Sequence, residues 1–169
     1  MPSAFIIRVT SPADAEAVTA LLTASYPVLM ATAYDEAVLG AALPAMTRSN
    51  PALLSSGTFY VAEQDDGELA GCGGWTRERP GTGEVVPGLG HVRHFATRPE
   101  WIGRGVGRAL YRRCEEDARA AGVSRFECYA SLNAEGFYQA LGFATVARID
   151  IPMGARTAFP AMLMRRDLT

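Results

Sequence analysis

The stretch that decides the fold is residues 95–110, which read FATRPEWIGRGVGRAL. It starts in a predicted strand, about Leu89 to Thr97, and leads into a predicted helix, about Val106 to Ala121. Between the two lies a glycine-dense turn, Gly103 to Gly107. One face of the helix is apolar and carries Val106, Leu110, Cys114 and Ala118. The segment therefore predicts a strand, a turn and an amphipathic helix in direct succession.

Two arginines, Arg104 and Arg108, lie at the start of this predicted helix and oppose its dipole. The first N–H groups of a helix already carry partial positive charge, so added cations are unfavourable there unless an anion binds. A glycine-rich turn that opens a helix presents unpaired N–H groups to phosphate and lets the ligand approach closely. The turn favours a phosphate site; the competing interpretation is a surface loop whose arginines have no ligand.

Two well-known phosphate-binding loops can be compared with this turn. The P-loop pattern needs a Gly-Lys pair, and the chain contains no lysine. The dinucleotide fingerprint matches in half, because Glu127 lies near the position of the ribose-binding acid but Arg108 replaces the third small residue. Only about 60 residues follow the turn, too few for the remaining units of a dinucleotide fold. The P-loop is excluded, and a dinucleotide site is disfavoured.

The sequence on both sides of this segment predicts a mixed α/β domain. A strand over 5–9 precedes a helix that begins at Pro12, because Ser11 is a favourable N-cap. We expect Pro27 to interrupt this helix and Pro44 to follow the end of a second one, about Tyr34 to Leu43. The other predicted elements are strands at about 58–63, 68–76, 125–130, 143–151 and 161–166, a hairpin turn at 65–67, a flexible connection at 80–90 and a short helix at 134–141.

Length, composition and charge describe a soluble globular domain. The 169 residues are 49% hydrophobic, carry a formal net charge of −2, and need no disulfide to hold a core. We expect no nucleic-acid partner, because there is no basic excess, and no membrane association, because no apolar run approaches the roughly 20 residues of a span. The cysteines and histidines show no metal-ligand spacing, so no metal is expected. The first residues lack the features of a secretion signal, and a cytoplasmic location is expected.

At this point the sequence resembles a known family, the GNAT superfamily of acyl-CoA-dependent N-acetyltransferases. Residues 95–110 look like the family's pyrophosphate loop, whose core reads Q/R-x-x-G-x-G/A, except that Ile102 replaces the Gln or Arg. Residues 131–143, SLNAEGFYQALGF, are similar to the family segment that runs from an Asn through an aromatic pair to Gly-Phe. The resemblance implies a GNAT-like α/β fold in a single domain over 1–169, with a mixed, mostly antiparallel sheet of about six or seven strands flanked by about four helices.

The resemblance also implies that acetyl-CoA is the cosubstrate. Backbone N–H groups after Ile102 would hold its pyrophosphate, so we expect the isoleucine to do little harm. The end of the preceding strand would pair with the pantetheine amides as an added strand. Asn133 would contact the cofactor arm or, alternatively, cap the short helix. The residues assigned to acetyl-CoA are Phe95, Ala96, Thr97, Ile102, Gly103, Arg104, Gly105, Val106, Gly107, Arg108, Asn133 and Phe137.

Direct attack of an amine on a thioester needs a base, an oxyanion donor and a group that serves the departing thiolate. By resemblance, Tyr138 serves the thiolate, and the alternative is a tyrosine that only packs in the core. The resemblance puts His91 at the position of the base, and a histidine suits this role because its pKa is near 6.5. Strand alternation places His91 and His94 on opposite faces, and the sequence leaves open which face meets the cleft. Glu84 and a water relay are the other candidates.

Two further roles remain in this scheme. The oxyanion donor would be a backbone N–H around Phe95 or Ala96. An acyl-cysteine route through Cys128 is disfavoured, because no base adjoins this residue in the sequence and a buried small side chain is the simpler interpretation.

The reaction we expect is N-acetylation of a primary amine of a small molecule or a protein by direct attack in a ternary complex. The acceptor is unidentified, and its site has as candidates Tyr26, Tyr34, Trp75 and the loops 80–90 and 152–160. The rival hypotheses are a non-catalytic acyl-CoA-binding sensor or interaction module and, more weakly, a nicotinamide-dinucleotide enzyme. Relatives in the family associate through exposed strands, which makes a homodimer a candidate assembly.

Overall fold

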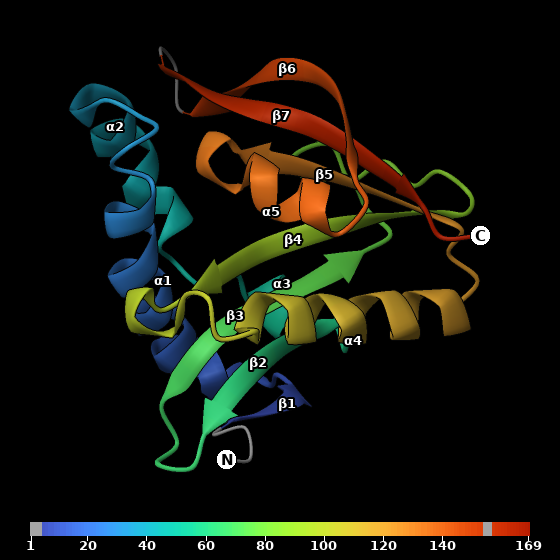
Figure 1. Ribbon diagram of the computed structural model, residues 1–169, viewed down its shortest axis with the longest axis horizontal. Coiled ribbons are helices and arrows are strands. Elements are labelled where there is room, and N and C mark those ends of the chain that lie inside the picture. Colours follow the sequence, from blue (N-terminus) through green and yellow to red (C-terminus); the bar gives the residue numbers. More distant parts are fainter. Residues whose placement is uncertain (1–4, 154–156) are drawn as a thin grey trace.

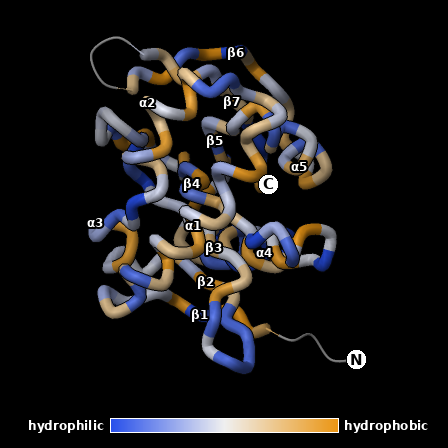
Figure 2. The backbone as a smooth tube through the Cα atoms, turned by 90° about the vertical axis from the view of Figure 1, so that its left-hand side faces the viewer, coloured by the Kyte–Doolittle hydropathy of each residue, from blue (hydrophilic) through white to orange (hydrophobic). Residues whose placement is uncertain are grey.

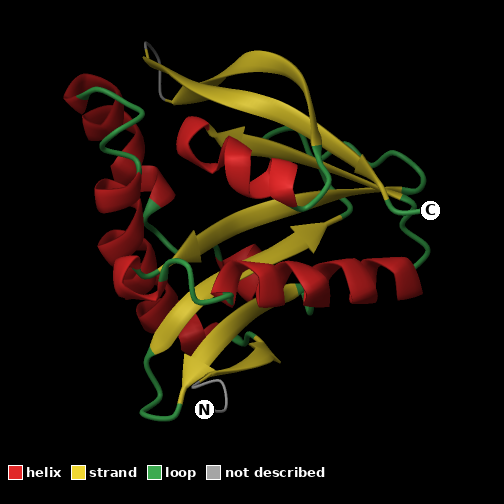
Figure 3. Ribbon diagram, in the orientation of Figure 1, coloured by secondary structure: helices red, strands yellow, loops and turns green. Residues whose placement is uncertain are grey.

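Seven strands form one sheet in the computed structural model, which describes residues 5–153 and 157–169 (Figure 1; Figure 3). All neighbouring strands are antiparallel except β4 and β5, which run parallel. The predicted mixed, mostly antiparallel α/β architecture is confirmed. In their order across the sheet, the strands are β1 (Phe5–Val9), β2 (Phe59–Gln64), β3 (Leu69–Thr76), β4 (Leu89–Thr97), β5 (Arg125–Ser131), β7 (Thr157–Asp167) and β6 (Ala144–Met153).

Five α-helices in the described residues cover the two faces of the sheet. They are α1 (Ala15–Leu29), α2 (Glu36–Met46), α3 (Pro51–Leu54), α4 (Val106–Ala120) and α5 (Glu135–Ala140). Figure 2 shows α2 and α3 on one side and α4 and α5 on the other. Two hydrophobic clusters fill these layers, one under α1 to α3 and one under α4 and α5. Four of these helices were expected from the sequence, and α3, a single turn, was not. Within residues 5–153 and 157–169, no helix is long and apolar enough to cross a membrane.

The amphipathic pattern of α4 explains its place in the second cluster. The predicted apolar face, Val106, Leu110, Cys114 and Ala118, is fully buried against the sheet. The helix begins at Val106 as predicted and ends one residue before the predicted limit, because Gly122 follows with a φ of +86° that stops it.

Pro27 and Pro44 do not end their helices, which corrects the sequence-based expectation. Each proline lies within the last turn, at a position where only one helical hydrogen bond is lost. Helical bonding resumes beyond it, from Met30 N–H to the Tyr26 carbonyl at 3.0 Å and from Thr47 N–H to the Leu43 carbonyl at 2.9 Å. Burial of Tyr26 and Met30 holds the end of α1 against the sheet.

The feature of the sheet that matters most for function is the divergence of β4 from β5. The two strands pair only from Leu89 with Arg125 to His91 with Glu127, so the rest of β4 has no partner on that side among the described residues. On its other side, β4 pairs with β3 through an irregularity at Cys72 and Gly74. His94 lies at this bulge with a φ of +52°, a left-handed conformation that is uncommon for a non-glycine residue.

Candidate active site

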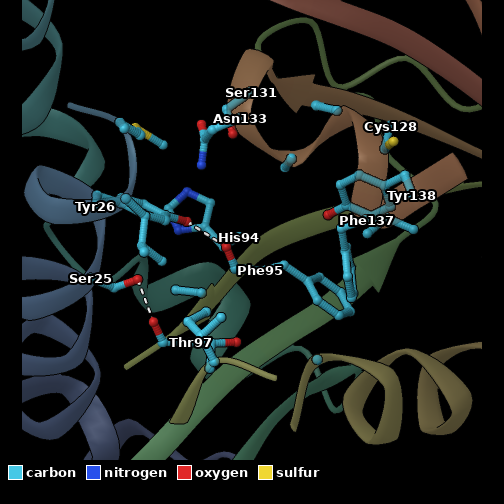
Figure 4. A pocket seen from close by; sticks show the side chains of 18 of the residues that line it. Ser25, Tyr26, His94, Phe95, Thr97, Cys128, Ser131, Asn133, Phe137 and Tyr138 are labelled. Atoms are coloured by element: carbon cyan, nitrogen blue, oxygen red, sulfur yellow. Dashed lines mark hydrogen bonds between the residues drawn. The ribbon is translucent and has the colours of Figure 1, made fainter. Parts of the chain in front are cut away.

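A cavity of about 850 Å³ opens where β4 and β5 diverge (Figure 4). Its walls come from α1, β4, the start of α4, β5, α5 and the β6–β7 hairpin. Val106 and Tyr138 line it from the cluster under α4 and α5, whereas Tyr26 and Phe159 line it from the cluster under α1 to α3. The cavity therefore passes through the sheet from one face to the other.

The free edge of β4 offers backbone donors to this cavity. Arg98 N–H donates to the Ala70 carbonyl of β3, so strand alternation turns the backbone groups of Phe95 and Thr97 away from β3 and towards the gap. Both carbonyls already accept a hydrogen bond from α1: the Tyr26 hydroxyl donates to Phe95 O at 3.1 Å, and the Ser25 hydroxyl donates to Thr97 O at 2.7 Å. The N–H groups of Phe95 and Thr97 remain as donors on this edge.

The start of α4 presents a second set of donors. The first helical hydrogen bond runs from Ala109 N–H to the Gly105 carbonyl, so the N–H groups from Gly105 to Arg108 have no helical acceptor, and no side chain caps them. Gly105 adopts a φ of +83°, which a residue with a side chain reaches only under strain. Gly107 has another reason to be glycine, because a Cβ there would lie 2.9 Å from Cε1 of Phe137 in α5.

The two arginines of the turn have different environments. Arg104 stacks its guanidinium 4.3 Å from the centroid of the Trp101 ring and does not line the cavity. Arg108 lines the cavity together with Ile102, whose side chain is 54% exposed. Among the lining residues that the structure describes, Arg108 is the single basic side chain of fixed charge, and it lies beside the free N–H groups. This end of the cavity suits a phosphate anion.

Tyr138 forms part of the opposite wall. Its ring is 6% exposed and packs edge-on against Phe95, Phe137 and Phe143, with ring centroids 5.1 to 6.2 Å apart. Burial raises the pKa of the hydroxyl well above 10, so it stays protonated. The residue therefore packs in the core and also lines the cavity, a position that allows either of its two sequence-based interpretations.

The two histidines of β4 lie in different places. His91 is 1% exposed, its Nδ1 is 3.5 Å from Glu127 Oε1, and it does not line the cavity. His94 does line the cavity, beside Tyr26 (Figure 4). Burial, together with the charge of Arg93, lowers the pKa of His94 to about 4, so its imidazole is neutral near pH 7. Of the two, only His94 is placed to meet a substrate in this cavity.

A family model described as an acetyltransferase (GNAT) domain matches residues 55–145. The match covers more than half of the chain, from before β2 to the start of β6, and includes the glycine-rich turn. The chain belongs to the GNAT acetyltransferase family. Membership confirms the resemblance seen in the sequence and supports acyl transfer that uses acetyl-CoA.

Solved structures of GNAT proteins share the fold. A GCN5-related N-acetyltransferase from Rhodopseudomonas palustris has 24% identity and a TM-score of 0.78, over 98% of this chain and 96% of its own. The PaiA N-acetyltransferase from Thermoplasma acidophilum, solved with coenzyme A, has 18% identity and a TM-score of 0.71, over 98% and 99% of the two chains. At identities this low, the similarity to these structures shows a shared fold. No curated protein matches the sequence significantly.

Most residues assigned to acetyl-CoA from the GNAT resemblance line the cavity. Arg104 is the exception. Asn133 lines the cavity and caps neither neighbouring helix: the short 3-10 turn over 132–134 has Ser131 at its N-cap, and α5 has Ala134. Within the described residues, no group of three potential metal ligands occurs.

Of the candidates Glu84, Cys128, Tyr34 and Trp75, only Cys128 lines the cavity. Glu84 pairs with Arg79 in the loop before β4, outside the cavity. Cys128 lines the cavity, but burial raises the pKa of its thiol, which disfavours a nucleophilic thiolate. Tyr34 stacks on Phe159, and its hydroxyl donates to the Pro160 carbonyl and accepts from Leu132 N–H. Trp75 is buried in the core.

The candidate acceptor regions are likewise divided. Tyr26 lines the cavity, whereas the loop 80–90 does not. Of the loop 152–160, Met153 and Phe159 line the cavity, and residues 154–156 lie outside the described residues.

One polar residue of the site, Ser25, was not predicted. It is fully buried and lies one helical turn after Leu21 on the apolar stripe of α1. A serine at an apolar position of a helix needs a partner, and here the partner is the Thr97 carbonyl. The serine on the apolar stripe of the helix was the feature of the sequence that could have indicated this buried hydrogen bond.

Proposed function

We propose that this GNAT protein is an N-acetyltransferase that moves the acetyl group of acetyl-CoA to a primary amine by direct attack in a ternary complex. The observation that carries the proposal is the cavity through the sheet, which brings the free N–H groups of α4 together with Tyr138 and His94. Acetyl-CoA would enter from the α4 face, and the amine would arrive from the α1 face.

Backbone donors would hold the cosubstrate. The N–H groups from Gly105 to Arg108 would bind the pyrophosphate, and the Arg108 guanidinium would add charge. Thr97 N–H would pair with the pantetheine arm as in an added strand. Phe95 N–H would then be the donor for the thioester oxygen, whose negative charge grows as the amine attacks.

The chemistry requires one bond to form and one to break. The amine nitrogen forms the N–C bond to the carbonyl carbon, the C–S bond breaks, and one proton leaves the nitrogen. The neutral imidazole of His94 would accept this proton, directly or through water, from the tetrahedral intermediate. Its pKa of about 4 makes it a weak base, so the amine must enter the cavity already neutral.

Tyr138 would stabilise the departing thiolate by donating a hydrogen bond. Its raised pKa keeps the hydroxyl protonated near neutral pH. A tyrosinate would be a stronger base than a thiolate, so the tyrosine would retain its own proton and the thiol would gain one from solvent.

We also propose a cytoplasmic location. Its support is that Cys72, Cys114 and Cys128 are all free and buried, as is usual in a reducing compartment.

The first experiment is a calorimetric titration of the protein with acetyl-CoA and, in parallel, with NADH. One-to-one binding of acetyl-CoA, followed by amine-dependent release of thiol, is the expected result. Acetyl-CoA binding without turnover on any amine would contradict the proposal and favour a sensor or interaction module. Preference for NADH would contradict acetyl-CoA as the cosubstrate.

A further inference from the structure

The α1-face end of the cavity has a distinct chemical character. Six of the side chains that line it there are large and apolar, and they come from the end of α1 and its C-cap, the end of α2 and the β6–β7 hairpin. They are Leu29, Met30, Met46, Ile151, Met153 and Phe159. Three of them are methionines, whose flexible thioether side chains adapt to apolar groups of varied shape.

No carboxylate lines the cavity in the described part of the chain. The residues outside that part, 1–4 and 154–156, contain no Asp or Glu in the sequence. Among the residues that the structure describes, the lining groups that could carry a positive charge are Arg108, at the phosphate end, and His94, which is neutral near pH 7. An additional ammonium group on an acceptor would therefore lose its hydration without gaining an anionic partner.

The polar groups near this end are neutral. Thr32, Ser131 and Asn133 line the cavity and can exchange hydrogen bonds with one amine or amide. Figure 4 draws Ser131 and Asn133 at the wall of the same cavity that His94 lines. One polar group on an otherwise apolar molecule would match this arrangement.

We infer that the acceptor is a primary monoamine on an apolar aliphatic or aromatic body. Polycationic amines, such as polyamines and aminoglycosides, are disfavoured. The inference rests on the proposed function and deepens it. A monoamine that loses its charge on entry leaves no unpaired ion in the cavity, which also fits the weak base available there.

The test compares kcat/KM for hexylamine, phenethylamine and spermidine at one pH, with thiol release as the readout. We expect the two apolar monoamines to exceed spermidine by at least tenfold. Equal or better use of spermidine would overturn the inference and leave the proposed function standing. Acetyl-CoA binding without turnover on any of the three would overturn the proposed function, and the inference with it.

A charge reversal sharpens the test. Met153→Glu places a carboxylate at the apolar end, and we expect the ratio of hexylamine to spermidine to fall by at least tenfold. Val146→Glu is the matched control, since Val146 lies on the same strand, is 51% exposed and does not line the cavity. An unchanged ratio in a folded Met153→Glu protein would overturn the inference. Met46→Glu repeats the change from α2 in case the first variant fails to fold.

Discussion

His94 lies on the wall of the cavity, whereas His91, three residues earlier on β4, lies sealed beside Glu127. The bulge in β4 separates their roles: His91 belongs to the last pair that joins β4 to β5, and the strand turns through His94 just beyond. The residue that the family resemblance put forward as the base is therefore not the one that reaches the cavity.

Replacing His94 tests its proposed role as the proton acceptor. Asparagine tolerates the left-handed backbone at this position, so His94→Asn should fold. We expect kcat to fall by about 100-fold, within the range typical of a lost general base, while acetyl-CoA binds with unchanged affinity. Steady-state kinetics together with calorimetry would measure both. An unchanged kcat would assign proton transfer to water alone.

The histidines also predict how stability depends on pH. Burial lowers the pKa of His91 and, with Arg93, lowers that of His94 to about 4. Between pH 6.5 and 4 the unfolded chain therefore binds protons that the folded chain does not, and the free energy of unfolding falls as the pH falls. We expect a loss of about 1 to 2 kcal/mol from His94 between pH 7 and pH 5 in urea unfolding.

His94→Asn is the comparison for this effect, because it should remove the His94 contribution to the pH dependence over the same interval and leave that of His91. Asp14 does not interfere, since its hydrogen bonds to Arg8 lower a pKa that starts at 3.8, below the interval measured. If the free energy of unfolding depended on pH equally in the two proteins, the lowered pKa of His94 would be contradicted.

Gly105→Asp should abolish acetyl-CoA binding. The substitution strains a residue with a φ of +83° and sets a carboxylate against the phosphates, so we expect affinity to fall on the order of 100-fold or more. Gly81→Asp is a matched control: Gly81 has a φ of +85° in open space, and it does not line the cavity. Calorimetry would compare the two, and equal affinities would contradict a phosphate site at α4.

Tyr138→Phe separates catalysis from binding. The variant keeps the ring that packs on Phe95, Phe137 and Phe143 and removes only the hydroxyl. We expect kcat to fall by about tenfold or more, the loss of one hydrogen bond to a charged group, with acetyl-CoA affinity and melting temperature nearly unchanged. A variant with full activity would show that the tyrosine serves only the core.

Glu127→Gln should weaken the fold without touching the cavity. Its carboxylate, 2% exposed, lies 3.3 Å from Arg79 Nε and 3.0 Å from Arg165 Nε. The arginines are partly exposed and can regain water, so we expect a loss of about 2 kcal/mol, below the value for a fully buried pair. Calorimetric melting would measure it. Glu84→Gln, which removes an exposed partner of the same Arg79, should have little effect.

Local patterns in the sequence determined most of the framework. The glycine-rich turn, the apolar stripe of α4 and the limits of β1 and β4 follow from interactions between residues close in the chain. The phosphate end of the cavity was predictable for the same reason, because helix N-terminal N–H groups and the turn that exposes them are contiguous in sequence. Ser25, which donates to the Thr97 carbonyl of β4, was not predicted from these local patterns.

Tertiary structure decided which histidine lines the cavity and which apolar side chains meet at its α1-face end. Regular alternation along β4 predicts His91 and His94 on opposite faces, but the bulge at His94 breaks that alternation: Val92 and Phe95 pack in one hydrophobic cluster and Ala96 packs in the other. The bulge and the divergence of β4 from β5 therefore decide which histidine meets the cavity. The helix α1 continues through Pro27 because burial of Tyr26 and Met30 compensates for a lost hydrogen bond. The apolar end of the cavity joins Met30, Met46 and Met153, three residues far apart in the chain. No pattern of short range could bring such residues together, because their proximity depends on how all seven strands pair.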